Sequence, residues 1–274
     1  MAHNLARLGC QVSLCGISGD DENRAILERK LTTLGIDATD LLKTGRPTTT
    51  KVRVIGGHQQ MLRLDFEETG ATSRKQEKQL IGAIRKKLDS GVDAVILSDY
   101  AKGVCSSSLC RALIQACRQV NIPLVVDPKG ANWKKYLGAF FVTPNVKELA
   151  EASRSPVFND DFSIELLART IRRRFAFDVL MVTRSEKGLS LFGEDRVTHI
   201  PTYAREVFDV SGAGDTVAAV MGAALAAGLK PGAAAHLANL AAGVVVAKLG
   251  TYAISATELE AALAEIQHPE EWEQ

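Results

Sequence analysis

The sequence predicts an α/β protein, with a three-layer, doubly wound, mainly parallel sheet and a small β-hairpin beside it. Short apolar runs alternate with helical patterns along most of the chain, which is typical of a parallel sheet covered by helices. Several of these runs end in polar residues, as strands do where a sheet forms a ligand site. The 274 residues are 46% hydrophobic, enough for a large core, and no repeat or linker interrupts them. We therefore predict one domain over residues 1–274.

The individual elements follow from apolar periodicity and from start and stop residues. Gly9 and Gly35 end the first two helices, Asp21 lies at the start of the second, and Pro231 opens the last. The predicted helices cover residues 1–8, 20–34, 73–88, 106–120, 164–175, 215–229 and 231–249. The predicted strands cover residues 12–17, 94–98, 123–126, 140–143, 179–183 and 189–192.

Residues 49–67 are predicted to form the hairpin. Two runs that alternate apolar and polar residues flank Gly56 and Gly57, a pair typical of a hairpin turn. The alternation gives one apolar face and one charged face, and the charged face includes Arg63 and Asp65. A surface hairpin with one solvated face accounts for this pattern without any further role.

The loop over residues 209–216 reads Asp-Val-Ser-Gly-Ala-Gly-Asp-Thr and precedes an Ala-rich helix. Gly212 and Gly214 allow a tight turn, and the helix N-terminus offers unpaired amides that suit a phosphate. A carboxylate beside such a site repels the anion, so Asp215 needs an explanation. It either caps the helix or acts as a general base on a hydroxyl that attacks the phosphate.

Four predicted strands end in polar segments, at residues 99–103, 127–130, 143–145 and 183–185. Ligands bind beyond the carboxyl ends of such strands, and Lys102 and Lys129 could neutralise phosphate charge there. Asn145 and Glu148 form N-x-x-E at the start of a helix. This pair suits a capping box as well as a ligand site.

The glycine loop, together with these strand ends, resembles the ribokinase-like (PfkB) sugar kinases. The resemblance implies that Asp215 is the catalytic base and that the amides of Gly212, Ala213 and Gly214 form an anion hole. It also implies ATP and Mg²⁺ as cofactors and a small-molecule sugar phosphate as substrate. The hairpin, taken as residues 46–68, corresponds to the family's lid over the substrate, which also forms homodimer contacts.

Further site residues are carried over from the same resemblance. Asn145 and Glu148 would hold the water shell of Mg²⁺ and the nucleotide phosphates, and Lys129 would stabilise the transferring phosphate. Residues implied to bind nucleotide are Asn145, Glu148, Lys129, Thr183, Ser185, Gly188, Asn239 and Ala242. Residues implied to face the sugar phosphate are Arg63, Asp65, Asp99 and Lys102.

Within this family the sequence is most similar to the heptose-7-phosphate kinases of lipopolysaccharide core biosynthesis. These kinases would phosphorylate the anomeric hydroxyl of D-glycero-β-D-manno-heptose 7-phosphate to the 1,7-bisphosphate, on the way to ADP-heptose. No H-x-G-H signature of a fused nucleotidyltransferase occurs, so we expect this sequence to correspond to the kinase half alone. The segments that carry the similarity are residues 50–54, 63–68, 97–103, 126–130, 182–186 and 243–250.

Composition limits the partners and location that we expect, and the N-terminus differs from the family pattern. The formal charge of +1 gives no support to a nucleic-acid partner, and no apolar run approaches the ~20 residues that span a membrane. Five cysteines without C-x-x-C spacing favour reduced thiols and a cytoplasmic protein. The family's first strand and its Gly-Gly-x-x-Asn turn have no counterpart ahead of Met1, so we expect an N-terminally truncated kinase.

Two alternatives stay open at this point. The first is another ribokinase-like kinase that acts on fructose phosphate, a pentose or a nucleoside. The second is an inactive, truncated chain that still binds nucleotide or dimerises through the hairpin, because the loss of one strand would leave an unpaired sheet edge.

Overall fold

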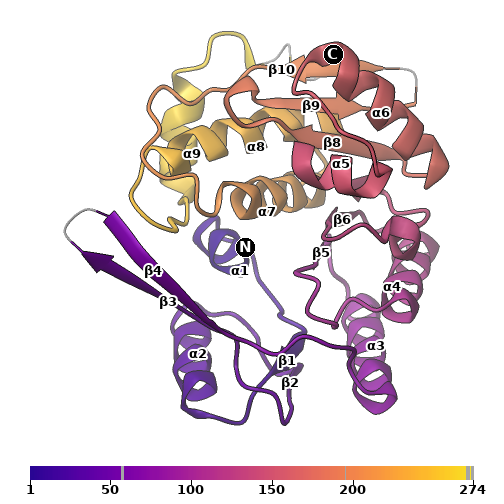
Figure 1. Ribbon diagram of the computed structural model, residues 1–274, viewed down its shortest axis with the longest axis vertical. Helices are drawn as coiled ribbons and strands as arrows, with labels where there is room; N and C mark the ends of the chain where they lie inside the picture. The colour runs from indigo at the N-terminus through magenta and orange to yellow at the C-terminus, as the bar shows by residue number, and fades with distance from the viewer. Residues whose placement is uncertain (57–58, 195, 270–271, 273–274) are drawn as a thin grey trace.

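The computed structural model describes residues 1–56, 59–194, 196–269 and 272, and its centre is a six-stranded sheet (Figure 1). The strand order is β10-β9-β8-β7-β6-β5. Strands β5 to β8 pair in parallel, whereas β9 and β10 run antiparallel to their neighbours. The mainly parallel sheet agrees with the predicted fold class. The strands are β5 (Val95–Ser98), β6 (Leu124–Asp127), β7 (Phe141–Val142), β8 (Val179–Thr183), β9 (Leu189–Phe192) and β10 (Val197–Ile200).

Helices cover both faces of this sheet and make the fold three layers thick. Successive strand residues point to opposite faces, so Leu124 and Val126 pack into one core and Val125 into the other. One face is covered by α3 (Arg74–Asp89), α4 (Ser107–Gln119), η1 (Trp133–Tyr136), α5 (Val146–Ser153) and α6 (Asp161–Arg174). The other is covered by α7 (Ala213–Ala226) and α8 (Pro231–Val246), with α9 (Ala256–Ala264) against α8. A short helix, η2 (Ser185–Lys187), follows β8.

The N-terminal segment forms a small unit of its own. It contains α1 (Ala2–Arg7), β1 (Gly16–Ser18), α2 (Glu22–Thr33) and β2 (Leu41–Lys43), and β1 and β2 make a separate parallel pair. The strand predicted over residues 12–17 is therefore shorter than expected, because β2 offers only three residues for pairing. Ser13 makes one isolated bridge to Asp37.

Asn4 joins α1 to α7 and to the segment that precedes α9. Its side-chain amide donates to Thr216 Oγ1 at 3.1 Å, and its Oδ1 accepts from the backbone N–H of Ile254 at 3.1 Å. Asn4 is buried, so these bonds are shielded from water. They place α1 beside the beginning of α7 (Figure 1).

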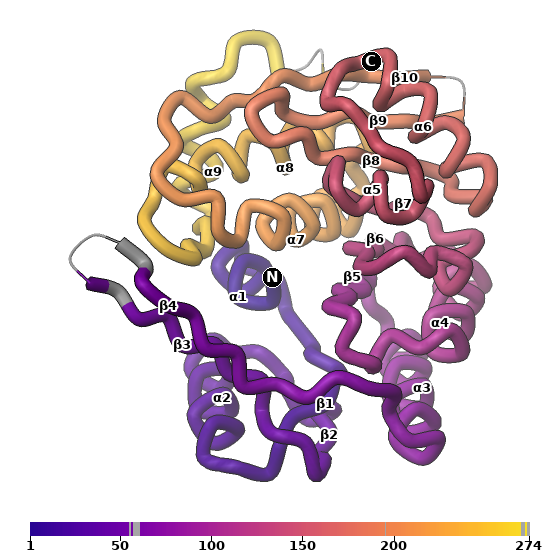
Figure 2. The backbone as a smooth tube through the Cα atoms, viewed as in Figure 1, coloured from indigo at the N-terminus to yellow at the C-terminus, as the bar shows by residue number. Residues whose placement is uncertain are grey.

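The hairpin consists of β3 (Thr50–Gly56) and β4 (Gln59–Phe66) and projects away from the body of the molecule (Figure 2). The strands pair antiparallel, with a register shift between Val54 and Ile55. Gly57, the second residue of the predicted turn, lies outside the described residues. None of the helices in the described part of the chain combines the length and hydropathy that a membrane crossing needs.

Candidate active site

The N-terminus of α7 presents backbone amides that no side chain caps. Gly212 is the N-cap residue with φ +88°, a conformation that favours glycine. The amide of Ala213 donates to the Val210 carbonyl at 3.2 Å, whereas the amides of Gly212 and Gly214 have no acceptor within the described chain. Such amides at a helix N-terminus favour an anion. Six other helices begin with a capping side chain: Asp21, Ser73, Ser106, Asn145, Asp160 or Ser255.

Asp215 is the third residue of α7, and its carboxylate does not cap the helix. It accepts a hydrogen bond from the Tyr100 hydroxyl, at 3.0 Å to Oδ1 and 3.3 Å to Oδ2. The backbone nitrogen of Met1 lies 4.0 Å from Oδ2. No Lys or Arg of the described residues pairs with it, and 31% of the side chain is exposed. The general-base role of Asp215 therefore stays a prediction.

Asp99 anchors the loop that carries Tyr100. Its carboxylate accepts from the Tyr136 hydroxyl at 2.5 Å and from the Ala101 amide at 2.6 Å, and it pairs with Lys135. Asp99 is only 4% exposed, so burial demands these partners. Both oxygens of Asp99 have partners within the protein, and its contact with the substrate stays a prediction.

Asp127 lies at the end of β6, in register with Ser98 of β5. Burial raises the pKa of Asp127 to about 7, helped by the negative charges of Glu148 and Asp215 and opposed by Lys129. Asp127 belongs to the polar strand end predicted at residues 127–130, from which only Lys129 was assigned to the site. The available signal was its position as the last residue of an apolar strand.

The structure brings together three of the predicted site residues: Lys129, Asn145 and Glu148. Lys129 Nζ lies 2.8 Å from Glu148 Oε1, and this hydrogen bond raises the pKa of Lys129. Asn145 and Glu148 also form both bonds of a capping box at the start of α5. In the described residues no group of three or more His, Cys, Asp or Glu side chains is arranged to hold a metal directly. A Mg²⁺ ion at this place would be held through water, which suits its chemistry.

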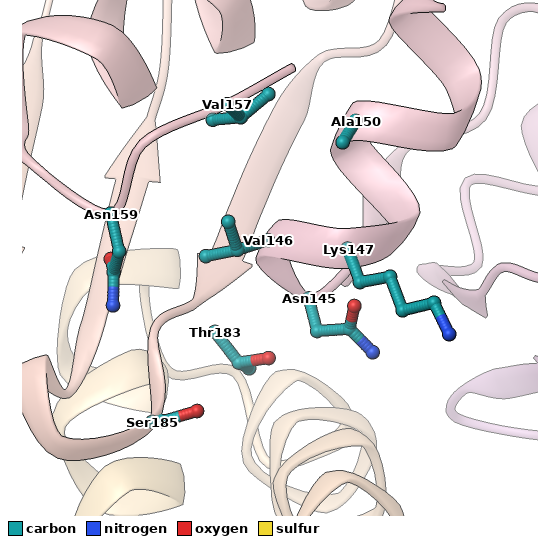
Figure 3. A pocket seen from close by; sticks show the side chains of 8 residues that line it. All are labelled: Asn145, Val146, Lys147, Ala150, Val157, Asn159, Thr183 and Ser185. Atoms are coloured by element: carbon teal, nitrogen blue, oxygen red, sulfur yellow. The ribbon is translucent and has the colours of Figure 1, made fainter. Parts of the chain in front are cut away.

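A cavity of about 530 Å³ opens beside this cluster, between the start of α5 and the end of β8. Three predicted nucleotide residues line it: Asn145, Thr183 and Ser185. Figure 3 shows the polar ends of these three side chains and of Lys147 directed to the same side. The volume lies in the range of small-molecule sites.

The loop after β8 is held in place by Arg184, which is only 2% exposed. Its guanidinium contacts Asp161 at 2.6 Å and Asn159 and Ser190 at 3.0 Å. Gly188 ends this loop with φ +77°, and a Cβ there would lie 2.1 Å from the Ile200 carbonyl oxygen. The structure thus gives Gly188 a turn role that only glycine can fill.

Asn239 and Ala242, the predicted adenine neighbours, are not among the residues that line this cavity. Asn239 is buried in α8, and its side-chain amide donates to the Pro201 carbonyl at 2.7 Å. Ala242 is half-buried on the same helix. Their contact with nucleotide stays a prediction.

The charged face of the hairpin connects with the β5–α4 loop through a chain of ion pairs. Arg63 makes two bonds to Asp65, both at 3.0 Å. Lys51 Nζ lies 3.3 Å from Asp65 and 3.5 Å from Glu67, and Lys102 pairs with Glu67. Three predicted substrate residues, Arg63, Asp65 and Lys102, thus belong to one charged network.

Comparison with known proteins places these features in a family. The sequence matches the pfkB family carbohydrate kinase over residues 1–258. It is 44% identical to the bifunctional protein HldE of Trichlorobacter lovleyi over 266 residues, and 45% identical to that of Azorhizobium caulinodans. These matches cover 96% of this chain but 54% and 55% of the relatives, so the chain spans about half their length.

Solved structures share the fold at much lower sequence identity. Phosphofructokinase-2 from Escherichia coli, in complex with potassium, has a TM-score of 0.81 at 17% identity, covering 96% of this chain and 84% of that one. Arabidopsis thaliana ribokinase, complexed with ribose and ATP, has a TM-score of 0.77 at 18% identity, covering 97% and 86%. The predicted ribokinase-like fold is confirmed.

Proposed function

The chain belongs to the pfkB family of carbohydrate kinases, and we propose that it transfers the γ-phosphate of ATP to the anomeric hydroxyl of D-glycero-β-D-manno-heptose 7-phosphate. The product would be the 1,7-bisphosphate, an intermediate toward ADP-heptose and the lipopolysaccharide core. The observation that carries the chemistry is the Asp215 carboxylate, which lies beside uncapped helix amides without a Lys or Arg partner in the described chain. The choice of sugar rests on the similarity to heptose kinases and on the relatives named HldE.

The proposed mechanism uses Asp215 as general base. It takes the proton of the 1-hydroxyl as that oxygen attacks the γ-phosphorus in line and the bond to ADP breaks. The free amides at Gly212 and Gly214 would receive the transferring group at the mouth of α7, and Lys129 would offset its charge. Ala213 belongs to the same predicted hole, but its amide already has an acceptor.

ATP would lie along the strand ends, where Asn145, Thr183 and Ser185 line the cavity. The donor set fits Mg²⁺: the oxygens of Asn145 and Glu148 would hold its water shell, and the half-buried Asp127 carboxylate lies close enough to Glu148 to feel its charge. When bound, the ion supplies positive charge at the β- and γ-phosphates. Because the reaction consumes ATP, we place it in the cytoplasm.

The hairpin over residues 46–68 is proposed as the lid over the sugar phosphate. Its charged face carries Arg63 and Asp65, and their network reaches Lys102 of the β5–α4 loop through Glu67. A phosphate that enters this network would compete with Asp65 and Glu67 for the cations.

The test of substrate choice is ADP release with heptose 7-phosphate, fructose 6-phosphate, ribose and adenosine. We expect turnover with heptose 7-phosphate. Turnover with fructose 6-phosphate, ribose or adenosine but not with heptose 7-phosphate would contradict the proposal.

The apolar face of the hairpin is proposed to pair with a second copy of the chain. Five residues on this face are 40–55% exposed: Val52, Val54, Leu62, Leu64 and Phe66. An apolar patch of this kind on a projecting hairpin is typical of a contact surface.

We expect the wild-type chain to sediment at twice its 29.5 kDa mass, and the double variant Leu62→Asp with Leu64→Asp to sediment as a monomer. The charges would be buried without partners in the dimer, which costs several kcal/mol. Phe162→Asp is the matched control, because Phe162 is 77% exposed on α6, outside the hairpin. A monomeric wild-type chain at micromolar concentration, or a dimer that persists in the double variant, would contradict this arrangement.

A further inference from the structure

The Tyr100 hydroxyl is the donor that contacts both oxygens of Asp215, at 3.0 and 3.3 Å. The two residues lie 115 positions apart in the sequence, on different elements. We propose that Tyr100 is a positioning residue, which holds the Asp215 carboxylate in the orientation that accepts the sugar proton. This inference rests on the proposed function and adds a residue that the family resemblance did not assign.

The loop that carries Tyr100 is fixed on both sides, so the hydroxyl has a defined place. On one side Asp99 is anchored by Tyr136, Lys135 and the Ala101 amide, and Ala101 adopts φ +55°. On the other side Gly103 packs so tightly on the segment between the hairpin and α3 that a Cβ would meet the Gly70 carbonyl oxygen at 1.5 Å. A loop held in this way can set the direction of a side chain that it carries.

The protonation of Tyr100 suits the role of donor. Partial removal of Tyr100 from water and the negative charge of Asp215 raise the pKa of Tyr100, so it keeps its proton across the physiological range. Among the described residues, Asp215 also faces the carboxylate of Asp127, from the end of β6, and the N-terminal ammonium of Met1, before α1. Of these neighbours, Tyr100 is the one within hydrogen-bond distance.

The hydrogen bond leaves room for the reaction. An ionised carboxylate has about four acceptor positions, and one donor occupies only part of them. The sugar hydroxyl can therefore donate to Asp215 while Tyr100 remains bound. During transfer the sugar proton moves to Asp215, the sugar oxygen bonds to phosphorus, and ADP leaves; Tyr100 neither gains nor loses a proton.

A packing role for Tyr100 is the competing explanation, and its exposure argues against it. Tyr100 is 55% exposed, whereas Tyr136, whose hydroxyl also donates to a carboxylate, is fully buried. Replacement of Tyr100 by Phe removes one hydroxyl from a side chain that is outside the core. The variant is therefore expected to fold as the wild type does.

The test compares Tyr100→Phe with Tyr252→Phe, which loses the same kind of bond, to Glu258 at 2.7 Å, outside the site. A hydrogen bond donated to a carboxylate favours its ionised form, so its loss makes ionisation harder. In Tyr100→Phe we expect kcat to fall about 10-fold, KM for ATP to stay within twofold, and the acid limb of the pH–kcat profile to move up by about one pH unit. Tyr252→Phe should match the wild type in all three.

A second measurement separates this inference from the proposed function. In protein with ¹³C-labelled aspartate, the carboxyl signal missing from Asp215→Asn identifies Asp215, and its titration midpoint should rise in Tyr100→Phe. A raised midpoint in a chain without heptose kinase activity would support the Tyr100 contact and overturn only the proposed substrate. An unchanged midpoint and acid limb, or the same change in Tyr252→Phe, would overturn the positioning role.

Discussion

Asp215→Asn is expected to lower kcat by about 10²–10⁴-fold, the usual contribution of a general base. The amide is nearly the same size as the carboxylate and cannot take the sugar proton. KM for ATP should change little, because the proposed nucleotide residues Asn145, Thr183 and Ser185 lie at other strand ends. Steady-state kinetics with a coupled ADP assay measure both quantities.

Asp178→Asn is the matched control for this variant. Asp178 pairs with Arg118 on the surface and is 43% exposed, far from any proposed role in the reaction. It should retain wild-type kcat. Near-normal turnover in Asp215→Asn would show that Asp215 is not the general base but only a residue of the first turn of α7.

Asp127→Asn is expected to change how stability depends on pH. The folded-state pKa of about 7 lies well above the ordinary value of an aspartate carboxyl, so between these two values the native protein binds a proton that the unfolded chain releases. The native state is thus favoured at low pH, and this contribution is lost as pH rises from about 4 to about 7. The variant lacks the titrating group and should not show this loss.

Urea unfolding without nucleotide or metal, at pH 5 and pH 8, measures the effect. The free energy of unfolding of Asp127→Asn minus that of the wild type should be about 2–3 kcal/mol larger at pH 8 than at pH 5, so the variant is relatively more stable at pH 8. The exposed Asp178→Asn should show no such difference. If the unfolding free energies of wild type and Asp127→Asn change with pH in the same way, burial and the neighbouring carboxylates do not raise the pKa of Asp127.

Strands and helix starts that depend on local patterns could be predicted from the sequence. The strands at 179–183 and 189–192 have the predicted bounds, and Ser106 is the N-cap of the helix predicted there. β10 was missed, because four residues that end in one buried isoleucine give little periodicity. β1 was overextended, because its length depends on a partner strand that the local pattern does not reveal.

The candidate site was predictable where residue type and strand position decide it. Lys129, Asn145 and Glu148 meet because parallel strands end at one edge of the sheet. The sequence did not predict which side chains pair with the carboxylates of Asp99 and Asp215. The pairing of Asp99 with Lys135 and of Tyr100 with Asp215 depends on loop geometry between distant segments.

The central claim is that Asp215 and the amides at the start of α7 transfer phosphate to the anomeric oxygen of a heptose phosphate. The most direct measurement is ³¹P NMR of the chain with D-glycero-β-D-manno-heptose 7-phosphate, ATP and Mg²⁺. We expect a new phosphorus signal coupled to the anomeric proton, formed in equal amount to ADP and absent with Asp215→Asn. ADP that accumulates while the heptose 7-phosphate signal stays unchanged, or phosphate on any other hydroxyl, would contradict it.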